Sequence, residues 1–97
     1  MPEEDKSNLF NNIATIYRKS QMYSQAEEYY VQSINERMLK SPNNKQMLYN
    51  SYFELGLCQR EEGKFEESLK NFNLALNYTY EGIGSELKVL KEMCIAY

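Results

Sequence analysis

The sequence predicts an all-α fold, an α-α superhelix of about five helices that pair as stacked antiparallel hairpins. Apolar residues recur at the spacing of one helix face through most of the 97 residues. Residues that interrupt helices are rare, with two prolines and four glycines, and most of them lie between the apolar segments. A shift of 42 residues also superimposes the first hairpin on the second, which is typical of a repeated unit.

The first hairpin follows a short charged segment, residues 1–6. Its first helix is predicted by one apolar stripe, made of Leu9, Phe10, Ile13, Ala14, Ile16 and Tyr17. The stripe breaks at residues 19–22. Ser24 is then predicted to cap a second helix, with Glu27 completing a capping box, and this helix should reach about Lys40.

The second hairpin begins after a polar turn at residues 41–44, where Pro42 disfavours helix in the residue before it. Its first helix is expected to end near Gly63, and its second helix to begin by Phe65. Gly56 lies inside the first of these helices. Its small size predicts a close approach of the two helices at that point.

A fifth helix is predicted from Ser85, a good N-cap, to the last residue. We therefore expect one domain, residues 1–97, with repeat one at 7–40, repeat two at 45–81 and a half-repeat or capping helix at 85–97. The half-repeat has no hairpin partner and carries apolar residues on its outer side. We expect either that the chain is a piece of a longer array, or that this open C-terminal end is buried in a homodimer or a partner.

One motif occurs in both hairpins. It reads Phe10-x-x-Ile13-Ala14-x-x-Tyr17 with Ala26-x-x-x-Tyr30, and again Tyr52-x-x-Leu55-Gly56-x-x-Gln59 with Ser68-x-x-x-Phe72 and Ala75. A half copy reads Leu90-x-x-Met93-Cys94-x-x-Tyr97. These motifs resemble the tetratricopeptide repeat family, and the resemblance covers almost the whole chain. It implies stacked hairpins that bind proteins or peptides.

The chain departs from the family pattern in two ways. Gln59, Ser68 and Ser33 stand where the family usually has tyrosine, alanine and alanine, and all three changes are compatible with packing. The 42-residue shift also exceeds the usual repeat of about 34 residues, so each helix is expected to gain about a turn. The longer unit is similar to the repeats of kinesin light chains and of bacterial peptide-sensing regulators.

Composition excludes several classes of function. The chain has no histidine, and its adjacent glutamates diverge on a helix, so we expect no enzyme, no metal site and no cofactor. The net charge of −3 argues against nucleic-acid binding. No apolar run approaches the roughly 20 residues of a membrane span. Cys58 and Cys94 are expected to be small buried residues in a reducing compartment, so we expect a cytoplasmic protein.

Candidate binding residues follow from the resemblance, because the first helix of each hairpin lines a concave groove in such stacks. The groove positions are Asn8, Asn11, Asn12, Thr15, Arg18, Asn50, Phe53, Glu54, Leu57, Arg60, Lys88 and Lys91. The asparagines carry both a donor and an acceptor, which suits pairing with the backbone of an extended peptide. Phe53 and Leu57 are expected to form an apolar floor, and the basic residues to hold carboxylates. The alternative is that these polar residues only keep an exposed helix face hydrated.

The leading functional hypothesis is a non-enzymatic protein- or peptide-binding scaffold. In its most specific form this scaffold is the peptide-sensing part of a larger regulator, with a protein or peptide as partner and no nucleic acid or membrane. The alternative is a structural assembly or dimerisation module that has no groove ligand and uses its open ends.

Overall fold

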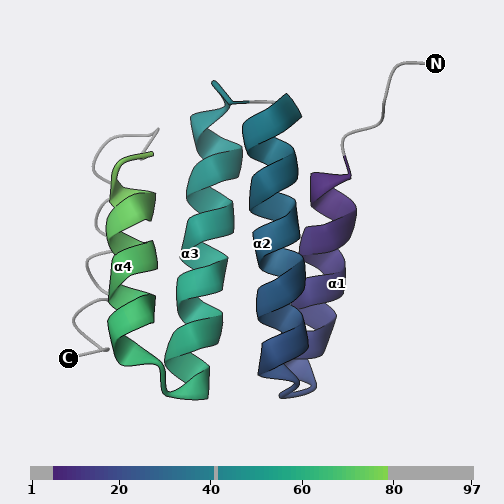
Figure 1. The fold of residues 1–97 in the computed structure, drawn as a ribbon, viewed down its shortest axis with the longest axis vertical. Coiled ribbons are helices and arrows are strands. Elements are labelled where there is room, and N and C mark those ends of the chain that lie inside the picture. Colours follow the sequence, from purple (N-terminus) through teal and green to yellow (C-terminus); the bar gives the residue numbers. More distant parts are fainter. Residues whose placement is uncertain (1–5, 41, 79–97) are drawn as a thin grey trace.

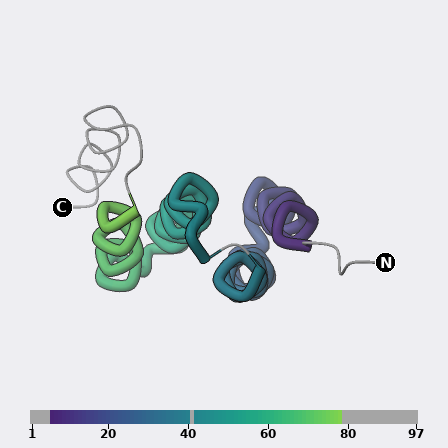
Figure 2. The backbone as a smooth tube through the Cα atoms, turned by 90° about the horizontal axis from the view of Figure 1, so that it is seen from above, coloured from purple at the N-terminus to yellow at the C-terminus, as the bar shows by residue number. Residues whose placement is uncertain are grey.

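The computed structural model describes residues 6–40 and 42–78, and in this part the chain consists of four helices (Figure 1). They are α1 (Ser7–Lys19), α2 (Tyr23–Lys40), α3 (Lys45–Glu62) and α4 (Phe65–Leu76). Each helix packs against the next in the chain. Viewed along the helices, α1 and α3 lie on one side of the stack, and α2 and α4 lie on the other (Figure 2). The predicted all-α stack of hairpins is confirmed, while the predicted helix at 85–97 lies outside the described residues.

The turn between α1 and α2 differs from the prediction. The helix α2 begins at Tyr23, so Ser24 is not its N-cap but an exposed residue of its first turn. The backbone N–H of Ala26 already donates to the carbonyl of Met22 at 3.1 Å. The chain reverses at Gln21, which has a positive φ of 63°. Glu27, predicted to complete the capping box, instead reaches from α2 toward α3.

The ends of α3 agree with the prediction. The side chain of Asn44 accepts a hydrogen bond from the backbone N–H of Met47 at 3.1 Å and so caps the helix. Gly63 ends it in the left-handed region, with φ of 95°. The N–H of Lys64 then donates to the carbonyl of Gln59 at 2.8 Å, which satisfies one of the last carbonyls of the helix. α4 begins at Phe65, as predicted.

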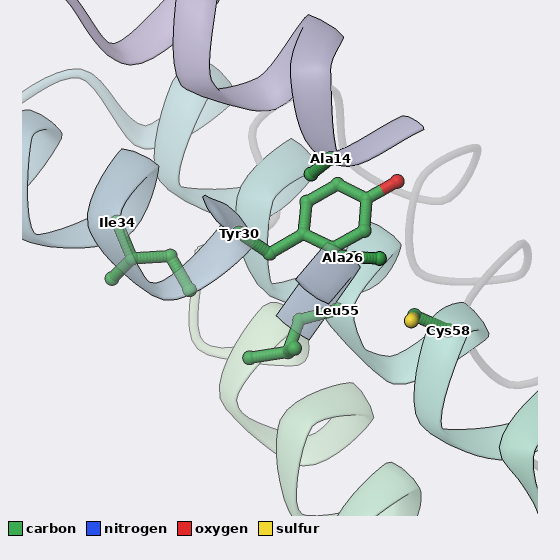
Figure 3. Close-up of a cluster of buried hydrophobic side chains, with 6 residues drawn as sticks. All are labelled: Ala14, Ala26, Tyr30, Ile34, Leu55 and Cys58. Atoms are coloured by element: carbon green, nitrogen blue, oxygen red, sulfur yellow. The ribbon is translucent and has the colours of Figure 1, made fainter. Parts of the chain in front are cut away.

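One hydrophobic cluster joins the two hairpins. It contains buried side chains from α1, α2 and α3, namely Ala14, Ala26, Tyr30, Ile34, Leu55 and Cys58 (Figure 3). A second cluster, between α3 and α4, contains Tyr49, Phe53, Phe72 and Ala75. Because the first cluster draws residues from both repeats, neither hairpin buries its apolar face without the other.

The extra length of the repeat lies in two helices. α2 and α3 each span 18 residues, whereas α1 has 13 and α4 has 12. The expectation that every helix gains a turn is therefore wrong for α1 and α4. The additional residues lie at the end of α2 and the start of α3.

Arg37 joins these additional turns to each other. It is buried near the end of α2, and its Nη1 atom donates to the carbonyl of Met47, at 2.7 Å, and to the hydroxyl of Ser51. Its Nη2 atom donates to Oδ1 of Asn8 at 3.0 Å. One guanidinium thus ties the start of α1 and the start of α3 to the end of α2.

Candidate functional site

A polar seam runs between α1 and α3 on the side of the stack that these helices share. We define the α1–α3 seam as five residues from three helices: Thr15, Arg18, Tyr30, Glu54 and Glu61. The phenol of Tyr30 reaches it from α2, and its oxygen lies 3.0 Å from Oγ1 of Thr15 and 3.3 Å from Oε2 of Glu54. Nε of Arg18 donates to the same phenol at 3.2 Å. Nη1 of Arg18 pairs with Glu61 at 3.0 Å and so bridges the two first helices directly.

The surroundings of the seam keep Tyr30 neutral and Arg18 charged. Burial, together with the charge of Glu54, raises the pKa of the Tyr30 phenol, so this group stays protonated at neutral pH. Burial lowers the pKa of Arg18, but its bond to Tyr30 and the nearby carboxylates outweigh that effect and raise the pKa above its usual range. The seam is therefore a bonded set of one cation, two acids and two hydroxyls.

The structure brings three of the predicted groove residues together. Thr15, Arg18 and Glu54 are all members of the seam, and Oγ1 of Thr15 lies 3.4 Å from Oε2 of Glu54. Their roles differ from the expectation in one respect. Arg18 was expected to hold a carboxylate of a ligand, but in the structure it is paired with Glu61 of the same chain.

The predicted asparagines lie in different surroundings. Asn8 and Asn50 are exposed, and Asn8 accepts the bond from Arg37. Asn11 is partly buried, and within the described part of the chain its Oδ1 atom is buried and accepts no hydrogen bond. Asn12 is exposed and corresponds by the 42-residue shift to Glu54, a residue that faces the preceding helices. Asn12 therefore lies on the side of α1 that points away from α3.

The apolar floor expected from Phe53 is not present as an open surface. Phe53 is 5% exposed, and its ring packs against Phe72 with ring centroids 5.6 Å apart, so it belongs to the core between α3 and α4. Leu57 is partly buried and packs against the same cluster, and Arg60 is partly buried. The predicted site residues Lys88 and Lys91 lie outside the described residues.

Sequence reasoning missed two residues that organise this side of the stack. The ring of Tyr30 was expected in the core, but its hydroxyl also links α1 to α3. Arg37 was missed altogether, although it continues the apolar stripe of α2 from Tyr30 through Ile34 at helical spacing. A charged residue in a buried stripe requires partners, and this was the signal that could have identified it.

A second polar cluster joins α2 to the end of α3. Glu27 accepts hydrogen bonds from Nε2 of Gln59 at 3.1 Å and from Nζ of Lys64 at 3.0 Å, and it shares a hydrogen bond with Glu62. Burial raises the pKa of Glu27, but these three bonds outweigh burial and hold that pKa below its usual value. The bond to Glu27 is also the main reason why the pKa of Glu62 is raised.

Among the residues that the structure describes, no group of histidine, cysteine or acidic side chains is arranged to hold a metal ion. None of the described helices has the length and apolarity that a membrane span requires.

Repeated antiparallel helical hairpins that share a core define a helical repeat protein. A family model for the tetratricopeptide repeat matches residues 7–37 and 49–81. The chain belongs to the tetratricopeptide repeat family, whose repeats generally mediate protein–protein interactions. The two matches begin at residues 7 and 49, in agreement with the 42-residue shift. Comparisons with curated proteins and with solved structures found no significant match.

Proposed function

We propose that this chain is a non-enzymatic module that binds a short extended peptide of a partner protein on its α1–α3 face. This face consists of the seam and the residues that flank it on the same two helices, namely Asn8, Asn11, Asn50, Leu57 and Arg60. One observation carries the proposal: side chains from the first helices of both repeats converge on Tyr30, so that two repeats present one surface. A ligand along this face touches both repeats at once.

The chemistry of the face favours recognition of a peptide backbone. The charges of Arg18 and Glu61 are already paired, so they contribute less to the capture of a charged ligand than separate charges would. The Oδ1 atom of Asn11 is buried and has no hydrogen bond within the described residues, so a rotation of this partly exposed amide would present it to a backbone N–H of a ligand. Asn50, exposed on α3, offers an amide for a neighbouring peptide group. Lys88 and Lys91 stay predicted binding residues, because they lie outside the described residues.

The wider setting of this module is also a proposal. The 42-residue spacing supports a likeness to the long repeats of kinesin light chains and of peptide-sensing regulators, and with it a sensor role inside a larger regulator. The buried free thiol of Cys58 supports a reducing compartment such as the cytoplasm. Homodimerisation through residues 85–97 stays a prediction, because that segment lies outside the described residues.

Selection of ligands from a random peptide library tests the proposal. Random 12-residue peptides displayed on phage are selected on the immobilised chain, and selected peptides are measured by fluorescence anisotropy against Asn11→Ala and Asn50→Ala. We expect each variant to weaken binding about tenfold, in line with the loss of one buried hydrogen bond.

Asn12→Ala is the matched control, because Asn12 is the same residue type on the same helix but points away from α3. It should change the affinity less than about twofold. The proposal fails if Asn12→Ala weakens binding as much as Asn11→Ala, or if selection returns no peptide that binds the folded chain.

A further inference from the structure

Three apolar side chains follow one another along the side of α1 that faces away from α3. They are Leu9, Ile13 and Ile16, which we call the outer stripe of α1. Leu9 is 56% exposed and Ile16 is 65% exposed, while Ile13 is partly buried. Their spacing of four and three residues places them on one helix face.

The repeat gives this stripe a counterpart inside the chain. The 42-residue shift places Leu9, Ile13 and Ile16 on Ser51, Leu55 and Cys58 of α3. All three counterparts are buried, at 0%, 5% and 0% exposure. Leu55 and Cys58 pack in one cluster with Ala26, Tyr30 and Ile34 of α2 (Figure 3), and Ser51 bonds to Arg37 of α2.

The outer stripe is therefore the same surface that binds a helix elsewhere in this molecule. In α3 that surface covers the helix α2, and in α1 it is more apolar, because isoleucine replaces the cysteine and leucine replaces the serine. Two isoleucines and a leucine, two of them mostly exposed, provide the contact area of a helix-binding face.

Charge distinguishes between the possible occupants. Two exposed lysines, Lys6 and Lys19, lie at the two ends of α1, and no acidic residue occurs from Ser7 to Lys19. Two copies of α1 facing each other would bring these like charges together. Acidic residues beside the apolar stripe of a partner helix would instead be attracted to the lysines.

We propose that the outer stripe of α1 docks an amphipathic helix of another protein. That helix carries acidic residues beside its own apolar stripe. The α2–α3 contact sets the chemistry of that helix. In the partner helix, an aliphatic residue takes the position that Arg37 has in α2. This position lies opposite Leu9, and leucine cannot accept the hydrogen bond that Ser51 accepts from Arg37. The partner helix also carries a hydroxyl opposite Asn12, in the way that the phenol of Tyr30 in α2 lies opposite Glu54 in α3. This docking site is separate from the α1–α3 face and does not depend on a peptide bound there.

The probe for this site is a labelled 18-residue peptide with the sequence of residues 23–40 and one change, Arg37→Leu. It keeps the apolar stripe by which α2 contacts α3. With Arg37 replaced, its charged side chains are three glutamates, Glu27, Glu28 and Glu36, and one lysine, Lys40. Fluorescence anisotropy measures its binding to the 97-residue chain. We expect saturable binding that weakens at least about tenfold in Ile16→Glu and in Leu9→Glu, and that weakens as salt is added.

The control variant is Val31→Glu, because Val31 is an apolar residue of α2 that is 45% exposed and lies outside the stripe. It should bind the probe within about twofold of the parent chain. Circular dichroism checks that all variants are folded, and two variants of the stripe keep the test informative if one is not. Equal binding by the parent chain and both stripe variants, or no binding up to about 1 mM, overturns the proposal.

Light scattering on the chain alone separates the partner helix from self-association. We expect a mass that does not depend on Ile16. A dimer that Ile16→Glu dissociates would overturn the proposal, because a second copy of the chain would then be the occupant of the stripe.

Discussion

The ring of Phe72 on α4 lies directly against the backbone of Gly56 on α3. A Cβ atom added at Gly56 would lie 2.7 Å from two carbons of that ring, and the ring is fully buried. The hydroxyl of Ser68 also donates to the carbonyl of Gly56 at 2.9 Å, so α4 is held against α3 at this point. The close approach predicted from Gly56 is thus a contact between a ring and the backbone.

Gly56→Ala is therefore expected to destabilise the chain, although alanine is the better helix former. Overpacking a core costs about 1–3 kcal/mol, and the gain in helix propensity returns about 1 kcal/mol, so we expect a net loss of up to about 2 kcal/mol. Urea denaturation measures this loss. In a Phe72→Leu background the alanine should cost about half as much or less. An equal cost in both backgrounds would show that the ring is not the cause.

Tyr30→Phe tests the hydroxyl that links the two repeats. The ring remains in the core, but Thr15, Arg18 and Glu54 lose their shared partner. We expect a loss of about 1–2 kcal/mol in the free energy of unfolding, because partly buried groups are left with fewer bonds. Tyr29→Phe is the control, since the ring of Tyr29 stacks on Tyr17 and remains in the variant. A Tyr30→Phe chain as stable as the parent would contradict this role.

Arg37 is expected to be the most sensitive charged residue. Its guanidinium donates to Met47, Ser51 and Asn8, which belong to two other helices, and its side chain is buried. Arg37→Ala should destabilise the chain by about 2–4 kcal/mol, and Arg37→Lys should recover only part of this, because an ammonium cannot replace the planar fork. Asn8→Ala, which removes one acceptor, should cost about 1 kcal/mol. Full rescue by lysine in urea denaturation would show that charge alone is required.

The helices and the repeat could be predicted because they depend on local patterns. The apolar stripes, the turn before α3, and Gly63 gave the order of the helices and most of their ends, and the motif gave the family. The prediction of Ser24 as an N-cap was wrong because the bend at Gln21 starts α2 earlier. A local capping pattern does not include the path of the preceding turn.

The candidate site was predicted less completely, because its contacts join helices that are far apart in sequence. Thr15, Arg18 and Glu54 were identified from their helix positions, but the position alone could not show that Arg18 pairs with Glu61. Phe53 was placed on a groove because family positions do not indicate how deeply a large ring sinks toward α4. The hydroxyl of Tyr30 and the partners of Arg37 become visible only when three helices are assembled.

The raised pKa of Glu62 predicts that the free energy of unfolding depends on pH. Its pKa is raised in the folded chain, chiefly by the hydrogen bond to Glu27, so its contribution is fully present below the usual glutamate pKa and is lost as pH rises through the folded value. In the variant Glu62→Gln, the amide N–H of glutamine still donates a hydrogen bond to Glu27, but the side chain cannot ionise. The variant should be more stable than the parent at pH 7 by less than about 1 kcal/mol, since the side chain is partly solvated.

Below the usual glutamate pKa the difference between Glu62→Gln and the parent should vanish, because Glu62 is then protonated in both the folded and the unfolded chain. Urea midpoints measured across acid and neutral pH test this. Glu28→Gln, at an exposed position of α2, is the control for the removal of one negative charge. A Glu62→Gln variant that is less stable than the parent at pH 7 would contradict the prediction.

Cys58 is expected to be unreactive while the chain is folded. Burial, assisted by the charges of Glu27 and Glu62, raises the pKa of its thiol from 9.0 to about 12, and the side chain is 0% exposed. Since the thiolate is the reacting form, the fraction available at pH 8 falls about 10³-fold relative to an ordinary thiol. In a Cys94→Ser background, labelling with an aromatic disulfide should be slow in buffer and fast in denaturant. Because the thiol packs between α2 and α3, its labelling rate should follow the opening of that contact, and Arg37→Ala should accelerate it. Rapid labelling of the folded parent chain would show that Cys58 is accessible without opening.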